Sequence, residues 1–316
     1  MGQSWRSTPA GEHRAVLLAD VLRVLAPQGG EIAVDCTVGF GGHSVELLRK
    51  LMPAGRLIGI DRDALNLEPA RRRLPEVSDA FILHHGNFAG LPQILAANGI
   101  DKVDIVLADL GMSSMQVDDP ERGFSYSRPG PLDMRMDRSR GQTAADLLAT
   151  IAGAELATQL RELGDEPEAE RIAAAIVAAR DRQRIETTQE LAELIVQTLY
   201  PDRPAGKWRV QRVRYQWKTH PAARTFQTLR ILVNRELANL QQLLRVLPDV
   251  LKPGGRVAII SFHSGEDRLV KKAFRDGLRI GTYSKVSDDA VRAAEQERFE
   301  NPRSRSAKLR WAVRGG

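Results

Sequence analysis

A glycine-rich loop with an acid at its start lies near the beginning of the chain. It reads Asp35-Cys-Thr-Val-Gly39-Phe-Gly41-Gly42-His43 and follows the short apolar run Ile32-Ala-Val. Glycines allow a backbone to approach a ligand closely and to adopt positive φ angles. A carboxylate at Asp35 would repel the pyrophosphate of a dinucleotide, but it suits a cationic ligand such as S-adenosylmethionine (AdoMet). Asp35, Gly39, Gly41 and Gly42 are therefore candidate cofactor-binding residues.

A second acid, Asp61, follows the apolar run Leu57-Ile-Gly-Ile60. An acid that ends the second strand of a nucleotide-binding fold accepts hydrogen bonds from ribose hydroxyls. The loop and this acid together favour AdoMet over two alternatives, a nicotinamide or flavin cofactor and a purely structural glycine turn. Phe88, in Gly86-Asn-Phe88, either lies against the adenine ring or packs into the core.

A third acid, Asp109, follows the apolar run Val103-Asp-Ile-Val-Leu-Ala108 and is a candidate catalytic residue. An exocyclic base amine is a poor nucleophile, and a carboxylate that accepts its N–H bonds localises the nitrogen lone pair. Methylation of a pyrimidine ring carbon would instead require a nucleophilic cysteine. The only cysteine, Cys36, lies in the glycine loop after a different strand. The sequence therefore favours direct methyl transfer to nitrogen or oxygen.

These acids require a scaffold of strands alternating with helices. Four short apolar runs between Ile32 and Ala108 are separated by amphipathic stretches, which indicates βαβ units and a parallel sheet. From Met112 to about His220 the pattern is helical, after a polar loop at 118–140. One long helix over 223–247, a strand over 256–262 and a terminal strand over 308–313 then follow. The sequence predicts a doubly wound α/β domain (1–111 and 221–316) with a helical insertion (112–220).

Basic residues gather in two windows that contain no acid. The two windows together hold thirteen basic residues, which is more than the formal net charge of +6 of the whole chain. The remaining residues are therefore net acidic. Such blocks are typical of contacts with a polyanion. The alternative is a compositional preference of the genome, because most basic residues are arginine. The windows contain Arg203, Lys207, Arg209, Arg212, Arg214, Lys218, Arg224 and Arg230, and then Arg303, Arg305, Lys308, Arg310 and Arg314.

A polar segment, Ser261-Phe-His-Ser264-Gly-Glu-Asp267, follows the late strand. His263 is a candidate general base or base-stacking ring, and a structural histidine at a strand end is the alternative. Ser264 is interpreted as the N-cap of the next helix. No metal site is predicted, since Asp118, Asp119 and Glu121 are interpreted as a solvated turn rather than as ligands of a divalent ion.

Composition sets the remaining limits on the class of protein. The chain has 316 residues, 42% hydrophobic and 27% charged, which are ordinary globular values. No apolar run reaches the roughly 18 residues of a membrane span, and the first residues lack the apolar stretch of a signal peptide. A single cysteine excludes a disulfide framework and a cysteine-based zinc site. We expect a cytoplasmic protein without a membrane partner.

Several longer strings together resemble the family of bacterial 16S rRNA cytosine-N4 methyltransferases, known as RsmH or MraW. The likeness extends from about His13 to Arg314. The strings are Asp35-x-Thr-x-Gly-x-Gly-Gly-His-Ser44, Asp109-Leu-Gly-x-Ser-Ser-x-Gln116, Arg122-Gly-Phe-Ser, Gly130-Pro-Leu-Asp-Met-Arg-Met-Asp137, Arg140-Gly-Gln, His220-Pro-Ala-x-Arg-Thr-Phe-Gln227, Ser261-Phe-His-Ser264-x-Glu-Asp-Arg268 and Asn301-Pro-Arg-Ser-Arg-Ser306.

The resemblance implies an AdoMet-dependent enzyme that methylates N4 of a decoding-centre cytidine in 16S rRNA. It also implies a Rossmann-like class I methyltransferase fold with an inserted helical subdomain. The implied partner is 16S rRNA within the small ribosomal subunit, with no obligate protein partner. By motif position, AdoMet contacts would fall on Gly41, Gly42, His43, Asp61, Phe88, Asp109 and Gln116. The predicted RNA contacts are Arg203, Lys207, Arg209, Arg212, Arg214, Lys218, Arg224, His263, Arg303 and Arg305.

Two other functions remain open on the residues alone. The first is an AdoMet-dependent enzyme that acts on a protein or a small molecule. The second is an RNA-binding factor that retains the fold without catalysis. Steep weakening of binding with salt would favour an RNA substrate, because each phosphate contact releases counterions.

Overall fold

The computed structural model describes residues 14–202 and 220–316, and the chain divides into two compact units. The first unit combines Met1–Ser113 with Leu237–Gly316, and the second unit comprises Ser114–Glu236. Six predicted RNA contacts lie outside the described residues: Arg203, Lys207, Arg209, Arg212, Arg214 and Lys218.

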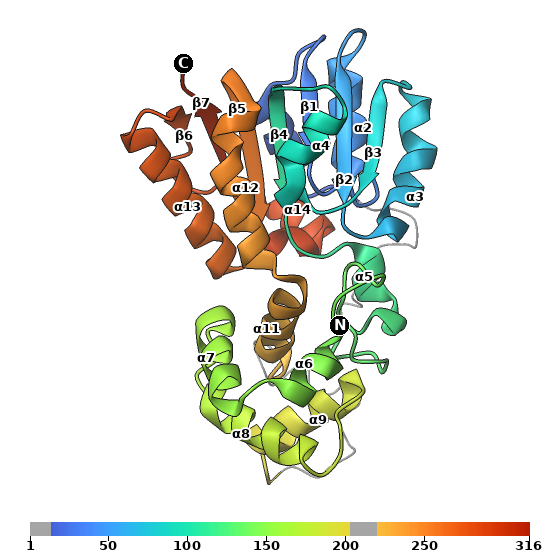
Figure 1. Cartoon of the computed structure of the whole chain (residues 1–316), viewed down its shortest axis with the longest axis vertical. Coiled ribbons are helices and arrows are strands. Elements are labelled where there is room, and N and C mark those ends of the chain that lie inside the picture. The colour runs from blue at the N-terminus through green and yellow to red at the C-terminus, as the bar shows by residue number, and fades with distance from the viewer. Residues whose placement is uncertain (1–13, 203–219) are drawn as a thin grey trace. The chain divides into compact units, whose positions relative to one another are not determined.

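The first unit is built on a seven-stranded sheet in the order β3-β2-β1-β4-β5-β7-β6 (Figure 1). Strands β1 to β5 pair in parallel, whereas β7 runs antiparallel to both β5 and β6. The strands are β1 (Ile32–Asp35), β2 (Arg56–Asp61), β3 (Phe81–His85), β4 (Val103–Asp109), β5 (Leu251–Ser261), β6 (Tyr283–Val286) and β7 (Lys308–Arg314).

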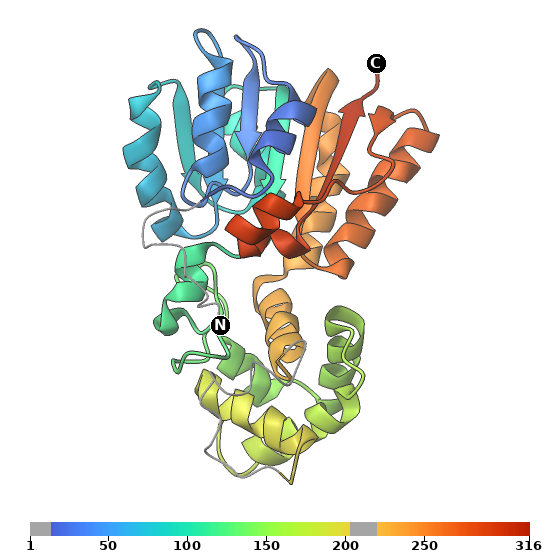
Figure 2. The same cartoon turned by 180° about the vertical axis from the view of Figure 1, so that it is seen from behind.

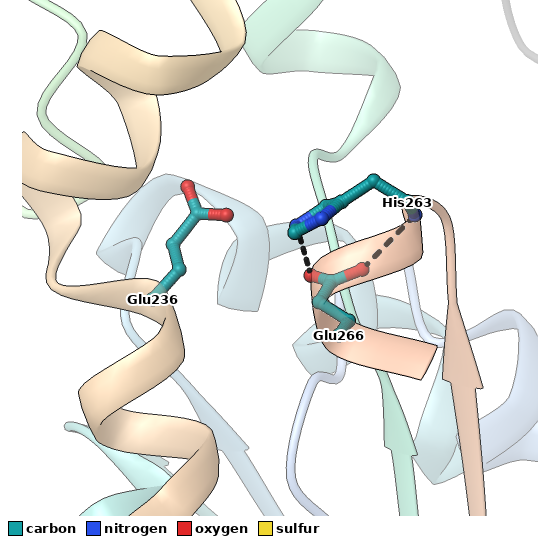
Figure 3. A group of neighbouring side chains, drawn as sticks. All are labelled: Glu236, His263 and Glu266. Carbon is teal, nitrogen blue, oxygen red and sulfur yellow. Dashed lines mark hydrogen bonds and ion pairs between the residues drawn. The ribbon is translucent and has the colours of Figure 1, made fainter. Parts of the chain in front are cut away.

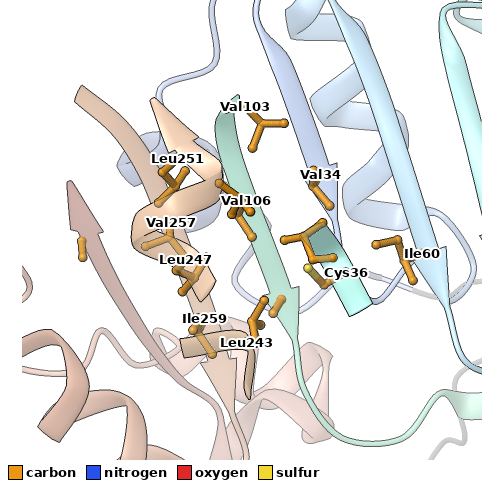
Figure 4. Close-up of a cluster of buried hydrophobic side chains, with 14 of the residues drawn as sticks. Val34, Cys36, Ile60, Val103, Val106, Leu243, Leu247, Leu251, Val257 and Ile259 are labelled. Atoms are coloured by element: carbon orange, nitrogen blue, oxygen red, sulfur yellow. The ribbon is translucent and has the colours of Figure 1, made fainter. Parts of the chain in front are cut away.

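Helices cover both faces of this sheet, and alternate strand residues face alternate helix layers. In β1, Val34 belongs to one buried cluster and Ala33 to the other. The first cluster joins the sheet to α4 (Leu91–Ala97), α12 (Glu236–Val250) and α13 (Ser264–Arg279) (Figures 1 and 4). The second joins it to α1 (Leu18–Leu25), α2 (Gly42–Leu51) and α3 (Ala64–Arg73), seen from behind in Figure 2. Burial of both faces explains why the strand sequences are continuous apolar runs.

The second unit is helical in its described part, with its own buried cluster. Its helices are α5 (Ser114–Asp118), α6 (Ala144–Thr150), α7 (Gly153–Gly164), α8 (Ala169–Arg180), α9 (Thr188–Leu199) and α11 (Ala223–Asn234). Thr143 with Asp146 and Thr187 with Glu190 form capping boxes that begin α6 and α9. Asn234 fixes the polar loop: its Nδ2 donates to the carbonyl of Met134, and its Oδ1 accepts the N–H of Met136.

The structure departs from the sequence prediction at the end of the insertion. The single helix expected over 223–247 is two helices, because Arg235 adopts a left-handed conformation (φ 52°) and ends α11. Phe226 and Leu229 of α11 are buried in the core of the second unit. The boundary of the two units accordingly falls after Glu236 rather than after residue 220. Strand β6 and the short helix α14 (Glu295–Glu300) carry no clear periodic pattern and were not predicted.

In the described ranges, no helix combines the length and the apolar character that a membrane span requires.

Candidate cofactor and active site

The three acids that the sequence analysis placed at strand ends lie at one edge of the sheet. Asp35, Asp61 and Asp109 are the last residues of β1, β2 and β4, which pair in parallel as neighbours (Figure 1). Carboxyl ends of parallel strands meet at the same edge, and ligands of open α/β sheets bind there. The tertiary structure thus joins acids that are 26 and 48 residues apart in the sequence into one candidate site.

Asp35 is fully buried and accepts hydrogen bonds from residues of its own loop and of the following helix. Its Oδ1 accepts the N–H of Thr37 (3.1 Å), and its Oδ2 accepts the hydroxyl of Ser44 (2.6 Å). Burial raises the pKa of this carboxyl, whereas the charge of His43 and the hydrogen bonds lower it. Each oxygen accepts a hydrogen bond within the protein, so Asp35 holds the glycine loop in shape, and its contact with a cofactor stays a prediction.

The glycines of the loop occupy conformations that other residues rarely adopt. Gly39 and Gly41 have φ angles of 53° and 77°, and Gly41 is the N-cap of α2. A Cβ on Gly41 would meet the Cβ of Ala70 at 3.2 Å. Among the described residues, a Cβ on Gly39 would meet only the carbonyl oxygen of Thr37, at 4.0 Å, so no described side chain closes the space beside this backbone. The loop is therefore a cradle in which a ligand can approach the main chain.

Asp61 joins the end of β2 to this cradle. Its Oδ2 accepts the N–H of Gly39 (2.8 Å), and its Oδ1 accepts the N–H of Asp63 (2.8 Å) and the amide of Asn66 (3.2 Å). Burial raises the pKa of Asp61 to about 6, although these hydrogen bonds lower it. Each carboxylate oxygen can accept about two hydrogen bonds, so Oδ2 retains capacity for a ribose hydroxyl.

Asp109 is the acid whose hydrogen bonding is incomplete. Its main-chain N–H donates to the hydroxyl of Thr37 (2.7 Å), and its Oδ2 lies 3.6 Å from Nδ1 of His43. Its Oδ1 is buried, and no group in the described part of the chain donates to it. Burial raises the pKa of Asp109 to about 6; the charge of His43 lowers it, and the charges of Asp35 and Glu266 raise it. A buried carboxylate oxygen without a partner is expected to receive a donor from a ligand.

Cys36, the one thiol, points away from this edge into the apolar cluster of the sheet, among Val34, Ile60 and Val106 (Figure 4). Burial and the charge of Asp35 raise the pKa of the Cys36 thiol. A buried thiol with a raised pKa is a poor nucleophile. The site therefore lacks the cysteine that carbon methylation of a pyrimidine needs.

Phe88 begins the 3₁₀ turn after β3 (Phe88–Gly90) and is half-buried against the same apolar cluster. Part of the Phe88 side chain therefore packs on the core, and contact of the remaining part with an adenine ring stays a prediction.

His263 is the N-cap of α13, so the N-cap predicted at Ser264 is one residue too late. Its Nε2 lies 3.3 Å from Oε1 of Glu266, while Oε2 of Glu266 accepts the N–H groups of Phe262 and His263 (Figure 3). The His263 side chain is mostly covered. The ring is therefore covered rather than exposed for stacking on a base, but neither ring nitrogen has a hydrogen-bond partner among the described residues, so a role as general base stays a prediction.

The C-terminal basic window separates into two groups. Arg310 and Lys308 bind Asp267 at 2.6 and 3.3 Å, and Arg314 donates to the carbonyls of Pro248 and Thr282. These three residues maintain the sheet edge rather than a surface for a polyanion. Arg303 and Arg305, the two predicted RNA contacts of this window, are exposed on the 3₁₀ helix Pro302–Ser306.

Two of the predicted site residues that the structure describes lie in the second unit. Gln116 is buried in α5, and Arg224 is exposed on α11. Arg230, which the charge count had included, is buried and forms a paired hydrogen bond with Glu236, at 2.9 Å for each nitrogen.

Sequence reasoning missed three residues that organise the edge. The hydroxyl oxygen of Thr37 accepts the main-chain N–H of Asp109. Asn66 donates to Asp61, and its Oδ1 accepts the hydroxyl of Ser113 (2.9 Å), so it links the loops after β2 and β4. A polar residue in the first turn of α3 is the only local sign of this link, and such residues are common at helix starts.

The residues present fit AdoMet. The space beside Gly39 allows the cofactor to approach the main chain closely, and Asp61 can accept hydrogen bonds from ribose hydroxyls. Oδ1 of Asp109 has no donor among the described residues and can accept one from a ligand. The strand order, the antiparallel β7 and the acids after β1, β2 and β4 define the fold as that of class I AdoMet-dependent methyltransferases.

Comparison with known proteins agrees with this class. The sequence model of the MraW methylase family matches residues 10–314, and the chain belongs to that family. A Geobacter sp. protein named ribosomal RNA small subunit methyltransferase H is 45% identical over 94% of this chain and 97% of its own length. Proteins of the same name from Solidesulfovibrio magneticus and Sorangium cellulosum are 44% and 43% identical, covering 96% and 98% of this chain and 95% and 93% of their own lengths. The predicted family, fold class and cofactor are confirmed.

Proposed function

We propose that this protein transfers a methyl group from AdoMet to the exocyclic N4 amine of a decoding-centre cytidine in 16S rRNA. The observation that carries the proposal is the buried Oδ1 of Asp109 at the carboxyl end of β4, which has no hydrogen-bond partner among the described residues. It combines with family membership over nearly the whole chain and with relatives that are named as small-subunit rRNA methyltransferases. We further propose that the enzyme acts in the cytoplasm, on rRNA within the small ribosomal subunit.

Residues of the first unit have distinct roles in this proposal. The main chain at Gly39, Gly41 and Gly42 and the carboxylate of Asp61 hold the cofactor, and Phe88 offers its exposed part to the adenine ring. When bound, AdoMet would supply a methyl group from a positively charged sulfur, and the C–S bond that breaks would leave its electron pair on that sulfur as a neutral thioether. His43 faces inward and contributes to the cofactor only through its main chain. Gln116 is kept as a candidate contact from the second unit.

Asp109 activates the acceptor amine. Its carboxylate accepts an N–H of the amine, which turns the nitrogen lone pair out of conjugation with the ring. When the new N–C bond has formed, the nitrogen bears one proton too many. Asp109 accepts that proton: the N–H bond breaks, its electron pair stays on the nitrogen, and a neutral carboxylic acid results. The site is therefore active only when Asp109 is ionised at the start.

The buried thiol of Cys36 supports nitrogen over ring carbon as the acceptor, since a C5 methyltransferase needs an accessible thiolate. Exposed Arg303, Arg305 and Arg224 are the described candidates for contacts with RNA phosphates. Arg203, Lys207, Arg209, Arg212, Arg214 and Lys218 remain predicted contacts from the sequence.

The function is tested by incubating the purified protein with labelled AdoMet and with either free 16S rRNA or small subunits that lack base methylation. Nucleosides from the digested RNA are then separated by mass spectrometry. We expect N4-methylcytidine at one site, with small subunits as the better substrate. 5-Methylcytidine, or labelling of protein alone, would contradict the proposal.

A further inference from the structure

The side-chain amide of Asn66 is enclosed by protein in the first turn of α3. Asn66 is 3% exposed, and helical side chains tilt toward the N-terminus of their helix, which here directs the amide back toward the end of β2. Its Nδ2 donates to Oδ1 of Asp61 (3.2 Å), and its Oδ1 accepts the hydroxyl of Ser113 (2.9 Å). A carboxylate accepts and does not donate, so the amide nitrogen faces Asp61 and the amide oxygen faces Ser113. One buried amide thus joins the end of β2 to the loop after β4.

The contact with Asp61 decides which carboxylate oxygen can bind a ligand. Oδ1 accepts the N–H of Asp63 (2.8 Å) as well as the amide of Asn66, and two hydrogen bonds fill the capacity of one oxygen. Oδ2 accepts the N–H of Gly39 (2.8 Å). Asn66 therefore leaves Oδ2, the oxygen on the side of the glycine loop, to accept a further donor.

The contact with Ser113 fixes the far end of the loop that begins at Asp109. At the start of this loop, the N–H of Leu110 donates to the carbonyl of Ile260 on β5 (2.9 Å). Gly111 follows with a φ of 107°, a conformation that favours glycine. Ser113 is the last residue of the first unit before the chain enters the second. The loop is therefore held at both ends, once by the sheet and once by the residue that also holds Asp61.

We propose that Asn66 is a positioning residue for both reactants of methyl transfer: its amide leaves Oδ2 of Asp61 for the ribose of AdoMet and holds the loop that carries Asp109 toward the acceptor amine. The inference rests on the proposed function and deepens it. Asn66 acts through its neighbours, because both ends of its amide bind protein atoms. AdoMet that binds to Asp61 should therefore restrain the loop through Asn66.

Three substitutions separate the two contacts of the amide. Ser113→Ala removes the hydroxyl that donates to Asn66 and leaves the contact with Asp61 in place. Asn66→Asp keeps an oxygen that can accept from Ser113, but a second carboxylate replaces the donor to Asp61. Asn66→Ala removes both contacts. Asn98→Ala is the matched control, because the amide that it removes donates to the carbonyl of Ile94 instead.

Calorimetry gives the AdoMet Kd of each variant, and initial rates of rRNA methylation at saturating AdoMet give kcat. Asn66→Asp should raise the Kd by about tenfold or more, because a second carboxylate disfavours the charge on Asp61, and keep kcat within about threefold. Ser113→Ala should do the reverse, with a Kd within about twofold and a kcat lowered by about three- to tenfold, the effect of one ordinary hydrogen bond. Asn66→Ala should show both changes and Asn98→Ala neither.

Hydrogen exchange of a peptide that spans residues 109–113 tests the connection without turnover. Saturating AdoMet should slow exchange in this peptide by about tenfold in the wild type and in Asn98→Ala. The slowing should be smaller in Ser113→Ala, although this variant binds AdoMet as tightly as the wild type. A merely structural role of Asn66 would not separate binding of AdoMet from restraint of the loop.

An AdoMet Kd and a kcat of Asn66→Ala that both stay within about twofold of the wild type overturn the inference. Parallel changes of Kd and kcat in Ser113→Ala and Asn66→Asp do so too, as does equal slowing of exchange in the wild type and Ser113→Ala. If the wild-type protein binds AdoMet but makes no N4-methylcytidine on any rRNA substrate, the proposed function fails instead. The Kd values and exchange rates then still decide whether Asn66 joins the cofactor acid to the loop.

Discussion

Carboxylates are held in opposite ways in the two units. At the sheet edge of the first unit, Asp61 is buried and Asp109 is half-buried with its Oδ1 covered, and burial raises the pKa of each to about 6. In the polar loop of the second unit, Asp133 binds Arg135 through Nε and Nη2 at 2.7 and 2.9 Å, and Asp137 binds Arg140 at 2.7 Å. The arginines and hydrogen bonds lower the pKa of Asp133 and Asp137 despite some burial.

The direction of the pKa shift distinguishes acids that are placed to bind ligands from acids that stabilise the fold. A carboxylate paired with arginine stabilises the folded state at neutral pH, since ionisation is easier in the folded than in the unfolded chain. A buried carboxylate with a raised pKa does the reverse. Such groups concentrate at functional sites because a ligand supplies the missing donors. The four predictions below test this contrast, from the largest expected effect to the smallest.

Asp109→Asn should reduce kcat for rRNA methylation by about 10²–10⁴-fold, because an amide cannot accept the proton of the amine. Asp104→Asn on the same strand is the matched control. Asp104 binds Lys252 and the N–H of Ile32 at the opposite end of β4, so its loss should cost stability and little activity. Retention of more than a tenth of the wild-type kcat in Asp109→Asn would remove Asp109 from the mechanism.

Asp61→Asn should weaken AdoMet binding by about 10–100-fold, which corresponds to the roughly 1.5–3 kcal/mol of a hydrogen bond to a charged group. Titration calorimetry measures the Kd directly. Asp137→Asn, which removes an acid of the second unit, should leave the AdoMet Kd unchanged. If the two substitutions changed the AdoMet Kd equally, acids of the two units would not differ in their role in ligand binding.

Lowering the pH from 7 to 5 should raise the AdoMet Kd by about tenfold, because a carboxyl with a pKa near 6 is mostly protonated one unit lower. In the absence of AdoMet, a lower pH has the opposite effect and stabilises the folded protein. The folded-state pKa of Asp61 and of Asp109 exceeds the 3.8 of an ordinary aspartate, so their contribution to the free energy of unfolding falls as pH rises from about 4 to 6. An AdoMet Kd that is constant over this range would contradict ionised carboxylates in the site.

Acids of the second unit should behave differently in the same experiment. Hydrogen bonds from Thr143 and Arg184 lower the pKa of Asp146 to about 2. Its contribution to stability is therefore complete above about pH 4 and is lost as pH falls toward 2. Between pH 5 and 7 it is constant.

Asp133→Asn should lower the free energy of unfolding by about 1–3 kcal/mol, because the buried acceptor of three Arg135 N–H groups loses its charge. Thermal unfolding followed by circular dichroism gives the change in Tm. Asp118→Asn, at an exposed pair with Arg128, should cost less than about 1 kcal/mol. A Tm change in Asp133→Asn no larger than in this control would show that the loop acids do not stabilise the fold.

Local patterns predicted most of the elements that carry the site. The apolar runs that end at Asp35, Asp61 and Asp109 became β1, β2 and β4, since alternation of strands and helices is recorded in the spacing of apolar residues. The helix expected over 223–247 was wrong. Its apolar periodicity continues through Arg235, but its first half packs in one core and its second half in another. Periodicity does not distinguish two cores.

Counts of charged residues along the sequence predicted fewer contacts correctly than the apolar patterns did. Arg230, Arg310 and Lys308 belonged to windows interpreted as polyanion contacts, yet each is paired with an acid of the fold. Asp267 binds arginine and lysine residues that are more than 40 positions away in the sequence. A count of charges along the chain cannot register partners at such separations, because ion pairing depends on distance in space.

By itself the sequence determined which residue types stand at the ends of the strands, the glycines between them and the family of the chain. Only the tertiary structure decided what each acid does. Asp35 and Asp109 end neighbouring strands in similar local settings, but Ser44 and Thr37 satisfy both oxygens of Asp35, whereas Oδ1 of Asp109 has no donor among the described residues. The glycine-loop motif also did not predict that the His43 ring turns inward, toward the carbonyl of Val16. Hydrogen-bond partners and burial set the charge of a carboxylate, and both arise only when distant segments pack together.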